Sequence, residues 1–452
     1  MGALLSCFRH RQTDSNVLSN IVRPLGGVED MFAAYSDAGS MTFSVACEVQ
    51  GEITERLLRS ALQSLQRRHK RLTLAIRQNG DSKSRRFFVH TGQDIPLKTF
   101  SRSQATSWEK LVAEDLAEPF EPEKGALLRT TALLGGQGLD NILILTFHHS
   151  LADGFSAMAV LEDLLFAISG QDWGGKESPW VETMEDWLGS SLFAEPKLPL
   201  GPPPDLSIVR NKWAVQRTNI PKVTSYSFSE ESTAIIARRS KEEKTTVHGA
   251  LLAAMAQARH DEAPKTYPAK GLRIMSPINA RTLYDKPSDQ VGVYITSAIT
   301  TSLPSDFTAS GTAVPGTDGN PNFWDQARNL QQTVSSARCK DSVIAVATVA
   351  ELQIRRDASP EAVTEFMRVG MDHEGLLSNL GKLSLKEQFG SYQVKQVWGP
   401  ALRTCIDHED TVGAGTFGGR LRLVHTTVDG PLNLVGRMAE IVEAQSMTTK
   451  DR

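Results

Sequence analysis

The 452-residue sequence has few cysteines, almost no excess of either charge and no long apolar run. Its four cysteines lie far apart, without a CxxC pair or a cysteine and histidine cluster of metal-ligand spacing, so we expect no metal site. They are Cys7, Cys47, Cys339 and Cys405. Isolated cysteines are typical of reduced thiols in the cytoplasm. The net charge of −3 gives no reason to expect a nucleic-acid partner. No apolar run approaches the roughly 20 residues that span a bilayer.

The first twenty residues are expected to form a leader ahead of the folded chain. Gly2 and Ser6 fit the N-myristoylation pattern, Cys7 is a candidate for palmitoylation, and Arg9 and Arg11 favour an anionic surface. Two lipid signals would attach the protein peripherally to a membrane. The alternatives are an unmodified leader and an organellar transit peptide, which contains arginine and serine and few acids.

Length and the alternation of strand-like and helix-like segments predict a mixed α/β protein of two lobes. The lobes are expected at residues 21–195 and 223–452, joined by a crossing linker at 196–222 where clustered prolines preclude regular structure. Amphipathic helices are predicted at 54–72 and directly after residue 154. The second lobe is predicted to contain helices at 230–241, 246–260 and 432–444, and strands at 272–275, 291–300, 392–397 and 420–427.

A short segment near residue 150 carries the most informative pattern. The uninterrupted apolar run at 142–147 predicts a buried strand, and two histidines, an aspartate and a glycine follow it closely. These residues are His148, His149, Asp153 and Gly154. A strand that ends at an imidazole holds a base of near-neutral pKa at a fixed point and leaves one face open to a substrate. The spacing therefore indicates a general-base site.

The segment matches HHxxxDG, and the chain resembles the chloramphenicol acetyltransferase-like acyltransferase superfamily, which includes alcohol acetyltransferases, polyketide-associated acyltransferases and peptide-synthetase condensation domains. Weaker similarities follow in the family's order, at residues 23–26, 67–69, 119–129, 246–254, 277–281 and 377–381. Lys70 and Ala126 stand where a proline is usual. The DFGWG segment typical of plant BAHD enzymes is absent, which argues against that branch. The resemblance implies two similarly folded lobes with a channel between them and the motif at their junction.

The resemblance also implies a role for each residue of the motif. His149 is the expected base, since a hydroxyl or amine must lose a proton as it attacks a thioester carbonyl. Alternation along the strand points His148 away, into the wall of the site. Asp153 could be interpreted as a triad carboxylate, but the resemblance implies instead a structural ion pair with Arg281 that holds the motif against the second lobe. Gly154 is expected to allow a sharp turn and to keep space beside the base.

Ser378 and Asn379 are the candidate donors to the oxyanion that forms during acyl transfer, because they carry polar groups in a segment that resembles the channel lining. A conformational Asx or Ser turn is the alternative interpretation. The other histidines have no partner spacing that suggests metal binding or catalysis. They include His248, His260, His373 and His425.

These observations predict a transferase of secondary metabolism that moves an acyl group from a thioester to a hydroxyl or amine of a small-molecule acceptor. The expected donor is acyl-CoA, which acts as a co-substrate, and no resident cofactor is expected. The alternatives are a free-standing condensation-type enzyme that takes its donor from an acyl carrier protein, and a catalytically idle family member that binds a ligand. The intact set of His149, Asp153, Gly154 and Arg281 argues against idleness.

Overall fold

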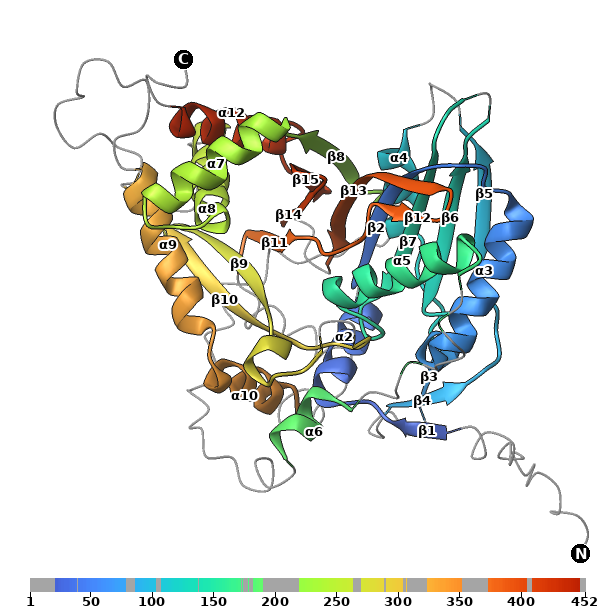
Figure 1. Ribbon diagram of the computed structural model, residues 1–452. Helices are drawn as coiled ribbons and strands as arrows, with labels where there is room; N and C mark the ends of the chain where they lie inside the picture. Colours follow the sequence, from blue (N-terminus) through green and yellow to red (C-terminus); the bar gives the residue numbers. More distant parts are fainter. Residues whose placement is uncertain are drawn as a thin grey trace, which may run out of the picture.

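The computed structural model shows two lobes, each built on a six-stranded sheet (Figure 1). The structure describes residues 21–38, 40–78, 86–102, 107–136, 138–171, 173, 178, 182–189, 219–262, 270–287, 290–303, 306, 323–351, 373–404 and 409–447. The lipidation candidates Gly2 and Cys7 and most of the predicted linker at 196–222 lie outside these residues. Within them, no helix is both long enough and apolar enough to cross a membrane. No three His, Cys, Asp or Glu side chains of this part gather as a metal-binding group.

The first sheet has the strand order β12-β13-β2-β7-β6-β5. Its strands are β2 (Thr42–Gln50), β5 (Leu97–Ser101), β6 (Leu128–Leu134), β7 (Asn141–His148), β12 (Gln388–Phe389) and β13 (Tyr392–Arg403). The strand β7 lies between β2 and β6 and is antiparallel to both. All of its residues are buried, as the apolar run predicts. The motif therefore begins at the end of an interior strand.

Two helices cover one face of this sheet, and a third covers the other. α3 (Glu55–Arg68) and α5 (Gly154–Ile168) lie side by side (Figure 1), and their leucines share a core with the alternate residues of β7. Thr54 begins α3 by accepting a hydrogen bond from the Leu57 amide. The predicted helix at 54–72 is thus α3 followed by the short 3-10 helix η1 (Lys70–Thr73). α4 (Trp108–Ala117) packs on the opposite face.

The second sheet has the strand order β10-β9-β11-β14-β15-β8. Its strands are β8 (Lys222–Ser227), β9 (Leu272–Asn279), β10 (Ile295–Ser302), β11 (Gly375–Lys382), β14 (Asp410–Phe417) and β15 (Arg420–Thr427). The helices α7 (Glu230–Glu242), α8 (Val247–Glu262), α9 (Phe323–Ala337) and α12 (Leu434–Ser446) form a core with it. The predicted strand at 291–300 begins only at Ile295, because residues 291–294 turn toward the motif. The two lobes and their mixed sheets confirm the predicted fold class.

One strand ties the two sheets together. β13 pairs with β2 of the first sheet, although it follows β11 in the chain, and it lies against β14 of the second sheet. A Cβ atom on Gly413 of β14 would come within 1.9 Å of the Pro400 carbonyl oxygen on β13, so only glycine permits this approach. The predicted lobes at 21–195 and 223–452 are continuous segments of the chain. The first sheet, however, also contains residues 388–403 from the second of these segments.

The remaining elements gather beside the motif at the junction of the two halves. β1 (Ile21–Pro24), β3 (Leu74–Gln78) and β4 (Arg86–His90) form a small antiparallel sheet. α2 (Gly27–Ala38), α6 (Met184–Leu188) and α10 (Lys340–Val349) share an apolar cluster with Ala280 and Tyr294 of the second half. This cluster fixes α2 next to the motif.

Candidate active site

His149 follows β7 directly and is a partly exposed residue. Its backbone amide donates to the Met41 carbonyl at 3.0 Å, which fixes the main chain. Its ring stacks on Phe32 of α2, with centroids 4.3 Å apart and planes 18° apart, and it also contacts Phe43 at 4.9 Å. Nδ1 is buried without a hydrogen-bond partner among the described residues, so Nε2 is the nitrogen that a substrate can reach.

Burial sets the charge state of His149. It lowers the pKa of the ring to about 4, against smaller upward effects of its own carbonyl, Asp153 and the Ala152 carbonyl. Neither carbonyl forms a hydrogen bond with Nδ1. An imidazole of this pKa is neutral at pH 7 and is ready to accept a proton.

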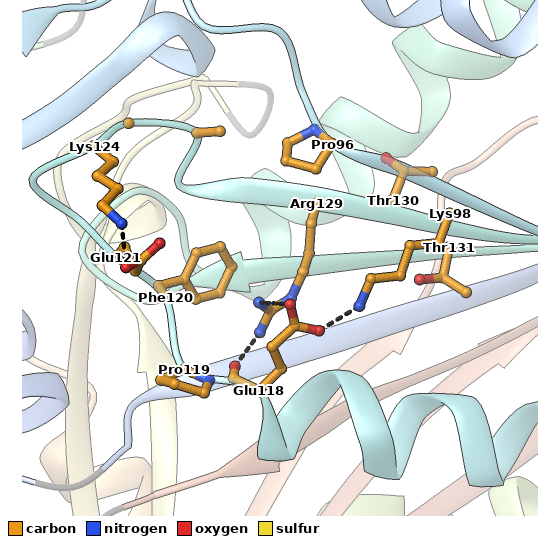
Figure 2. Close-up of a pocket in the computed structure, with 12 residues that line it drawn as sticks. Pro96, Lys98, Glu118, Pro119, Phe120, Glu121, Lys124, Arg129, Thr130 and Thr131 are labelled. Atoms are coloured by element: carbon orange, nitrogen blue, oxygen red, sulfur yellow. Dashed lines mark hydrogen bonds and ion pairs between the residues drawn. The ribbon is translucent and has the colours of Figure 1, made fainter.

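His148 points the opposite way, as strand alternation predicts. Its Nδ1 accepts a hydrogen bond from the Ser150 amide at 3.3 Å, and its ring meets the edge of Phe120 at 5.7 Å. Burial, followed by the neighbouring His149 ring and by Arg86 and Arg129, lowers the pKa of His148 to about 3. Figure 2 shows Phe120 beside the Arg129 side chain, where the two line a small surface cavity of about 170 Å³. His148 therefore lies in the wall behind the base.

Asp153 and Arg281 form a buried ion pair between the two halves of the chain. Nη1 of Arg281 lies 2.8 Å from Oδ2 of Asp153, and Nη2 lies 3.1 Å from Oδ1. Both side chains are at most 2% exposed. Asp153 also begins α5 by accepting from the amide and hydroxyl of Ser156, and it accepts from the Tyr294 amide at 2.9 Å. Its oxygens are thus engaged away from His149, in an arrangement that fits a structural role.

Gly154 is the first residue of α5, and its backbone is not in the left-handed region, so the expected sharp turn does not occur there. Space is the observed constraint, because a Cβ atom on Gly154 would lie 2.8 Å from Cδ2 of Leu380 on β11. The second half therefore packs directly on the helix that follows the motif.

The candidate oxyanion donors, Ser378 and Asn379, lie on β11. Oδ1 of Asn379 accepts from the Gly381 amide at 2.8 Å, which is the local turn of the alternative interpretation. The Asn379 side chain also lines a larger cavity in the second half. Ser378 is partly buried at the point where β11 pairs with Gly413 of β14. Within the described part of the chain, neither side chain hydrogen bonds to His149.

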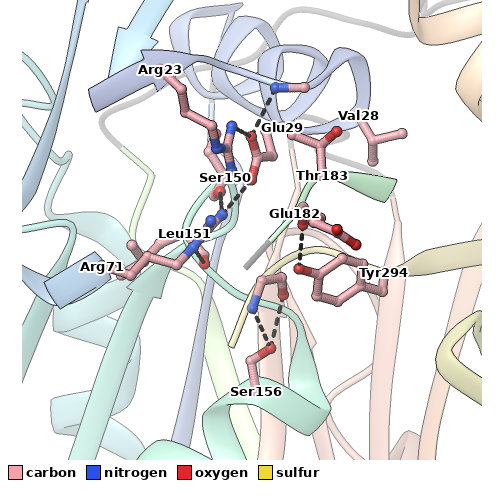
Figure 3. A network of polar contacts seen from close by, with 12 residues as sticks. Arg23, Val28, Glu29, Arg71, Ser150, Leu151, Ser156, Glu182, Thr183 and Tyr294 are labelled. Atoms are coloured by element: carbon pink, nitrogen blue, oxygen red, sulfur yellow. Dashed lines mark hydrogen bonds and ion pairs between the residues drawn. The ribbon is translucent and has the colours of Figure 1, made fainter. Parts of the chain in front are cut away.

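A network around Arg71, which the sequence pattern did not reveal, holds the backbone after His149 (Figure 3). Nε of Arg71 donates to the Leu151 carbonyl at 2.8 Å, and Nη2 donates to the Ser150 carbonyl at 3.3 Å and to Glu29. Burial alone would raise the pKa of Glu29, but Arg71 and Arg23 lower it to about 2. Glu29 therefore stays ionised between two guanidinium groups.

The same network positions the helix that carries Phe32. Glu29 accepts from the Gly26 amide at 2.8 Å, and Glu185 of α6 accepts from the Val28 amide at 2.8 Å, so both carboxyl groups lie at the start of α2. Burial raises the pKa of Glu185 to about 7. Arg71 and Glu29 thus connect the backbone after His149 with α2, whose Phe32 ring stacks on the His149 ring.

Known proteins share part of this sequence and its overall fold. Residues 32–179, which run from α2 to just beyond α5, match the Condensation domain family model. A linear gramicidin synthase protein from Brevibacillus parabrevis is 29% identical over 240 residues, which are 46% of this chain and 4% of that protein. The chain thus corresponds to a small part of this much longer relative.

Solved structures share the fold over nearly the full chain. Polyketide synthase associated protein 5 from Mycobacterium tuberculosis has a TM-score of 0.63 at 16% identity, covering 95% of this chain and 99% of that one. TRI101 from F. sporotrichioides, solved with coenzyme A and T-2, has a TM-score of 0.62 at 12% identity and covers 94% and 98%. The fold is that of chloramphenicol acetyltransferase-like acyltransferases and condensation domains, which confirms the resemblance drawn from the motif. The family match and the structural neighbours support acyl transfer as the general activity.

Proposed function

We propose that this protein transfers an acyl group from a pantetheine thioester, with acyl-CoA as the expected donor, to a hydroxyl or amine of a small molecule. The observation that carries the proposal is the place of His149 at the end of β7, where the residue is partly exposed and its ring stacks on Phe32 and contacts Phe43. The low pKa keeps this base neutral at pH 7, so it need not lose a proton before it acts.

In the proposed acyl transfer, Nε2 of His149 acts as the base. Nε2 removes the proton of the acceptor as its oxygen or nitrogen attacks the thioester carbonyl, and a tetrahedral oxyanion forms. The intermediate collapses with cleavage of the carbon–sulfur bond, and the imidazolium returns the proton to the leaving thiolate. Because burial disfavours the charged ring, this return is favourable. The proposed oxyanion donors remain Ser378 and Asn379; the Asn379 amide nitrogen is the available group, since Oδ1 is engaged by Gly381.

The second candidate is a condensation-type enzyme whose donor is bound to an acyl carrier protein. The match of residues 32–179 to the Condensation domain model favours it. The similarity to TRI101, whose structure contains coenzyme A, favours a free CoA donor instead. The same general base serves both reactions, so the donor must be decided by experiment.

The test is product analysis with the purified full chain. Mass spectrometry should detect acylated products after incubation with a panel of acyl-CoAs and a metabolite extract. The His149→Ala variant should lose about 100- to 10,000-fold in rate. The His90→Ala variant, which removes an exposed imidazole on β4, should keep the wild-type rate. Products formed only from carrier-bound acyl groups would assign the second candidate, and a complete absence of products from both donors would indicate the idle, ligand-binding alternative.

A further inference from the structure

The helix α2 lacks a capping side chain at the residue before it. That residue is Gly26, whose carbonyl accepts the first helical hydrogen bond, from the Asp30 amide at 2.9 Å. The residue at this position ordinarily caps a helix with a side-chain oxygen that accepts from an amide of the first turn, and glycine has no such oxygen. The Val28 amide in that turn therefore needs an acceptor from elsewhere in the chain.

Glu185 supplies this acceptor from 157 positions further along the chain. The residue is buried, and its Oε1 accepts from the Val28 amide at 2.8 Å. Oε2 is buried too and has no hydrogen-bond partner among the described residues. A Cβ atom on Gly26 would clash with Oε2, and one on Gly27 would lie 3.2 Å from Oε1. Glycine at both positions thus leaves room for the carboxyl group at the start of α2.

The short helix α6, which carries Glu185, is bound to a residue that contacts the motif. Trp187 of α6 stacks on Tyr294, with ring centroids 4.2 Å apart and planes 9° apart. The Tyr294 hydroxyl donates to the Glu182 carbonyl at 2.6 Å (Figure 3), and the Tyr294 amide donates to Asp153. These contacts fix α6, and with it Glu185, relative to the motif.

The contact between Glu185 and α2 does not depend on the charge of the carboxyl group. Burial raises the pKa of Glu185 to about 7, against the lowering effect of the Val28 amide, so the protonated and the ionised forms are both present at pH 7. A protonated carboxyl group keeps a carbonyl oxygen, so Oε1 can accept from the Val28 amide in either form. We therefore expect no pH dependence of the reaction rate from Glu185.

α2 carries the ring that stacks on the candidate base. Phe32 lies in the second turn of α2, and its ring centroid is 4.3 Å from that of His149. Nδ1 of His149 has no hydrogen-bond partner among the described residues, so contacts with neighbouring rings orient the imidazole. A helix whose first-turn amide loses its acceptor unwinds from that end, which would move Phe32 off the imidazole.

We propose that Glu185 is a positioning residue for acyl transfer: by holding the first turn of α2 it holds Phe32 against His149, and so fixes the direction in which Nε2 meets the acceptor. This inference rests on the proposed function, because that direction matters to catalysis only if His149 is the base. Glu185 acts through α2 and Phe32. A misdirected base slows the chemical step and leaves substrate binding unchanged, so the effect is expected in kcat and not in KM.

Steady-state kinetics of the full chain test the assignment. Glu185→Met keeps the length of the side chain but removes the acceptor, and it should lower kcat about 10-fold with little change in KM. Glu185→Gln keeps an oxygen acceptor and should retain most of the wild-type kcat. The control, Glu230→Ala, removes an exposed carboxylate at the start of α7 and should change neither constant. If Glu185→Met does not fold, Glu185→Asp replaces it, because the shorter side chain withdraws the oxygen from α2.

Nuclear magnetic resonance of isotope-labelled histidine reports on the His149 ring without any turnover. A stacked phenyl ring shifts the signal of the proton on Cε1 upfield, and Phe32→Leu should remove this shift. The signal is assigned by its absence from His149→Ala. In Glu185→Met the signal should move in the same direction as in Phe32→Leu, and in Glu185→Gln it should keep the wild-type position.

Three results would each overturn the assignment. They are a Glu185→Met protein with wild-type kcat and an unmoved signal, a change confined to KM, and a Glu185→Gln protein as slow as Glu185→Met.

The two measurements also separate this inference from the proposed function. A signal that moves in Glu185→Met, in a protein without any transferase activity, would support the positioning of the ring and contradict the function. Turnover that depends on His149, with a rate and a signal that are unchanged in Glu185→Met, would contradict the positioning and support the function.

Discussion

Removing one partner of the Asp153–Arg281 pair should strongly destabilise the protein. The Arg281 side chain donates five hydrogen bonds, to both oxygens of Asp153 and to Ser156, Gln290 and Asn279. Arg281→Met keeps much of the apolar volume but leaves the Asp153 carboxylate buried without its cation. Breaking a buried pair in this way costs about 3–5 kcal/mol, which is a large part of the stability of an ordinary domain.

The matched variant on the other side is Asp153→Asn. Asparagine also begins helices well, so this variant removes the charge but retains the start of α5. The loss of unfolding free energy in Asp153→Asn therefore measures the ion pair rather than the helix terminus. Asp153→Ala should cost about 1 kcal/mol more, because it removes that terminus as well. Urea unfolding of the wild-type protein, Asp153→Asn, Arg281→Met and the double variant completes a thermodynamic cycle.

The second substitution should cost much less in the double variant than it does alone, so the coupling free energy should be about 2–3 kcal/mol. Additive losses within about 0.5 kcal/mol would refute the reasoning. An Asp153→Asn protein of wild-type stability that has lost its activity would show instead that Asp153 orients the base.

Four further outcomes are expected. Because burial lowers the pKa of His149 to about 4, kcat/KM should stay level from pH 8 to pH 5, and a pH–rate profile that halves near pH 6.5 would contradict this. The unfolded chain binds protons at His148 and His149 below pH 6.5 whereas the folded one does not, so these two rings should together lower the free energy of unfolding by about 4 kcal/mol from pH 7 to pH 5. The fall measured in urea should therefore be about 2 kcal/mol smaller in His148→Leu than in the wild-type protein. Gly154→Ala should cost about 1–3 kcal/mol through its clash with Leu380, and Leu380→Ala should recover part of it in the same assay. Arg71→Ala should lower kcat about 10- to 100-fold with little change in KM, Arg71→Lys should recover part of the rate, and a change confined to KM would argue against a positioning role.

Local patterns were enough to predict the elements around the motif. The apolar run at 142–147 predicts a buried strand, and the leucine spacing after it predicts a helix. Each pattern depends on one segment alone, and both elements occur as expected. The structure also brings Asp153 and Arg281 together, a pairing that came from the resemblance and not from any spacing in the chain. The resemblance therefore supplied what periodicity does not contain.

Contacts between distant segments could not be predicted from the sequence. Arg71 reaches the Leu151 carbonyl across 80 positions, and an arginine after an amphipathic helix has the pattern of an ordinary surface residue. Phe32 was missed for the same reason, since its partner His149 comes from another element. β13 joins the first sheet by pairing with β2, which is far away in the sequence. Alternation along a strand does not specify such a partner.

The central claim is that Nε2 of His149 accepts the acceptor's proton. The most direct measurement is single-turnover acyl transfer by His149→Ala and wild-type protein at saturating thioester, with folding checked by circular dichroism and thioester binding checked by titration. The account predicts that the folded variant binds the thioester normally and transfers the acyl group about 100- to 10,000-fold more slowly. A folded His149→Ala protein that transfers the acyl group at the wild-type rate would contradict it.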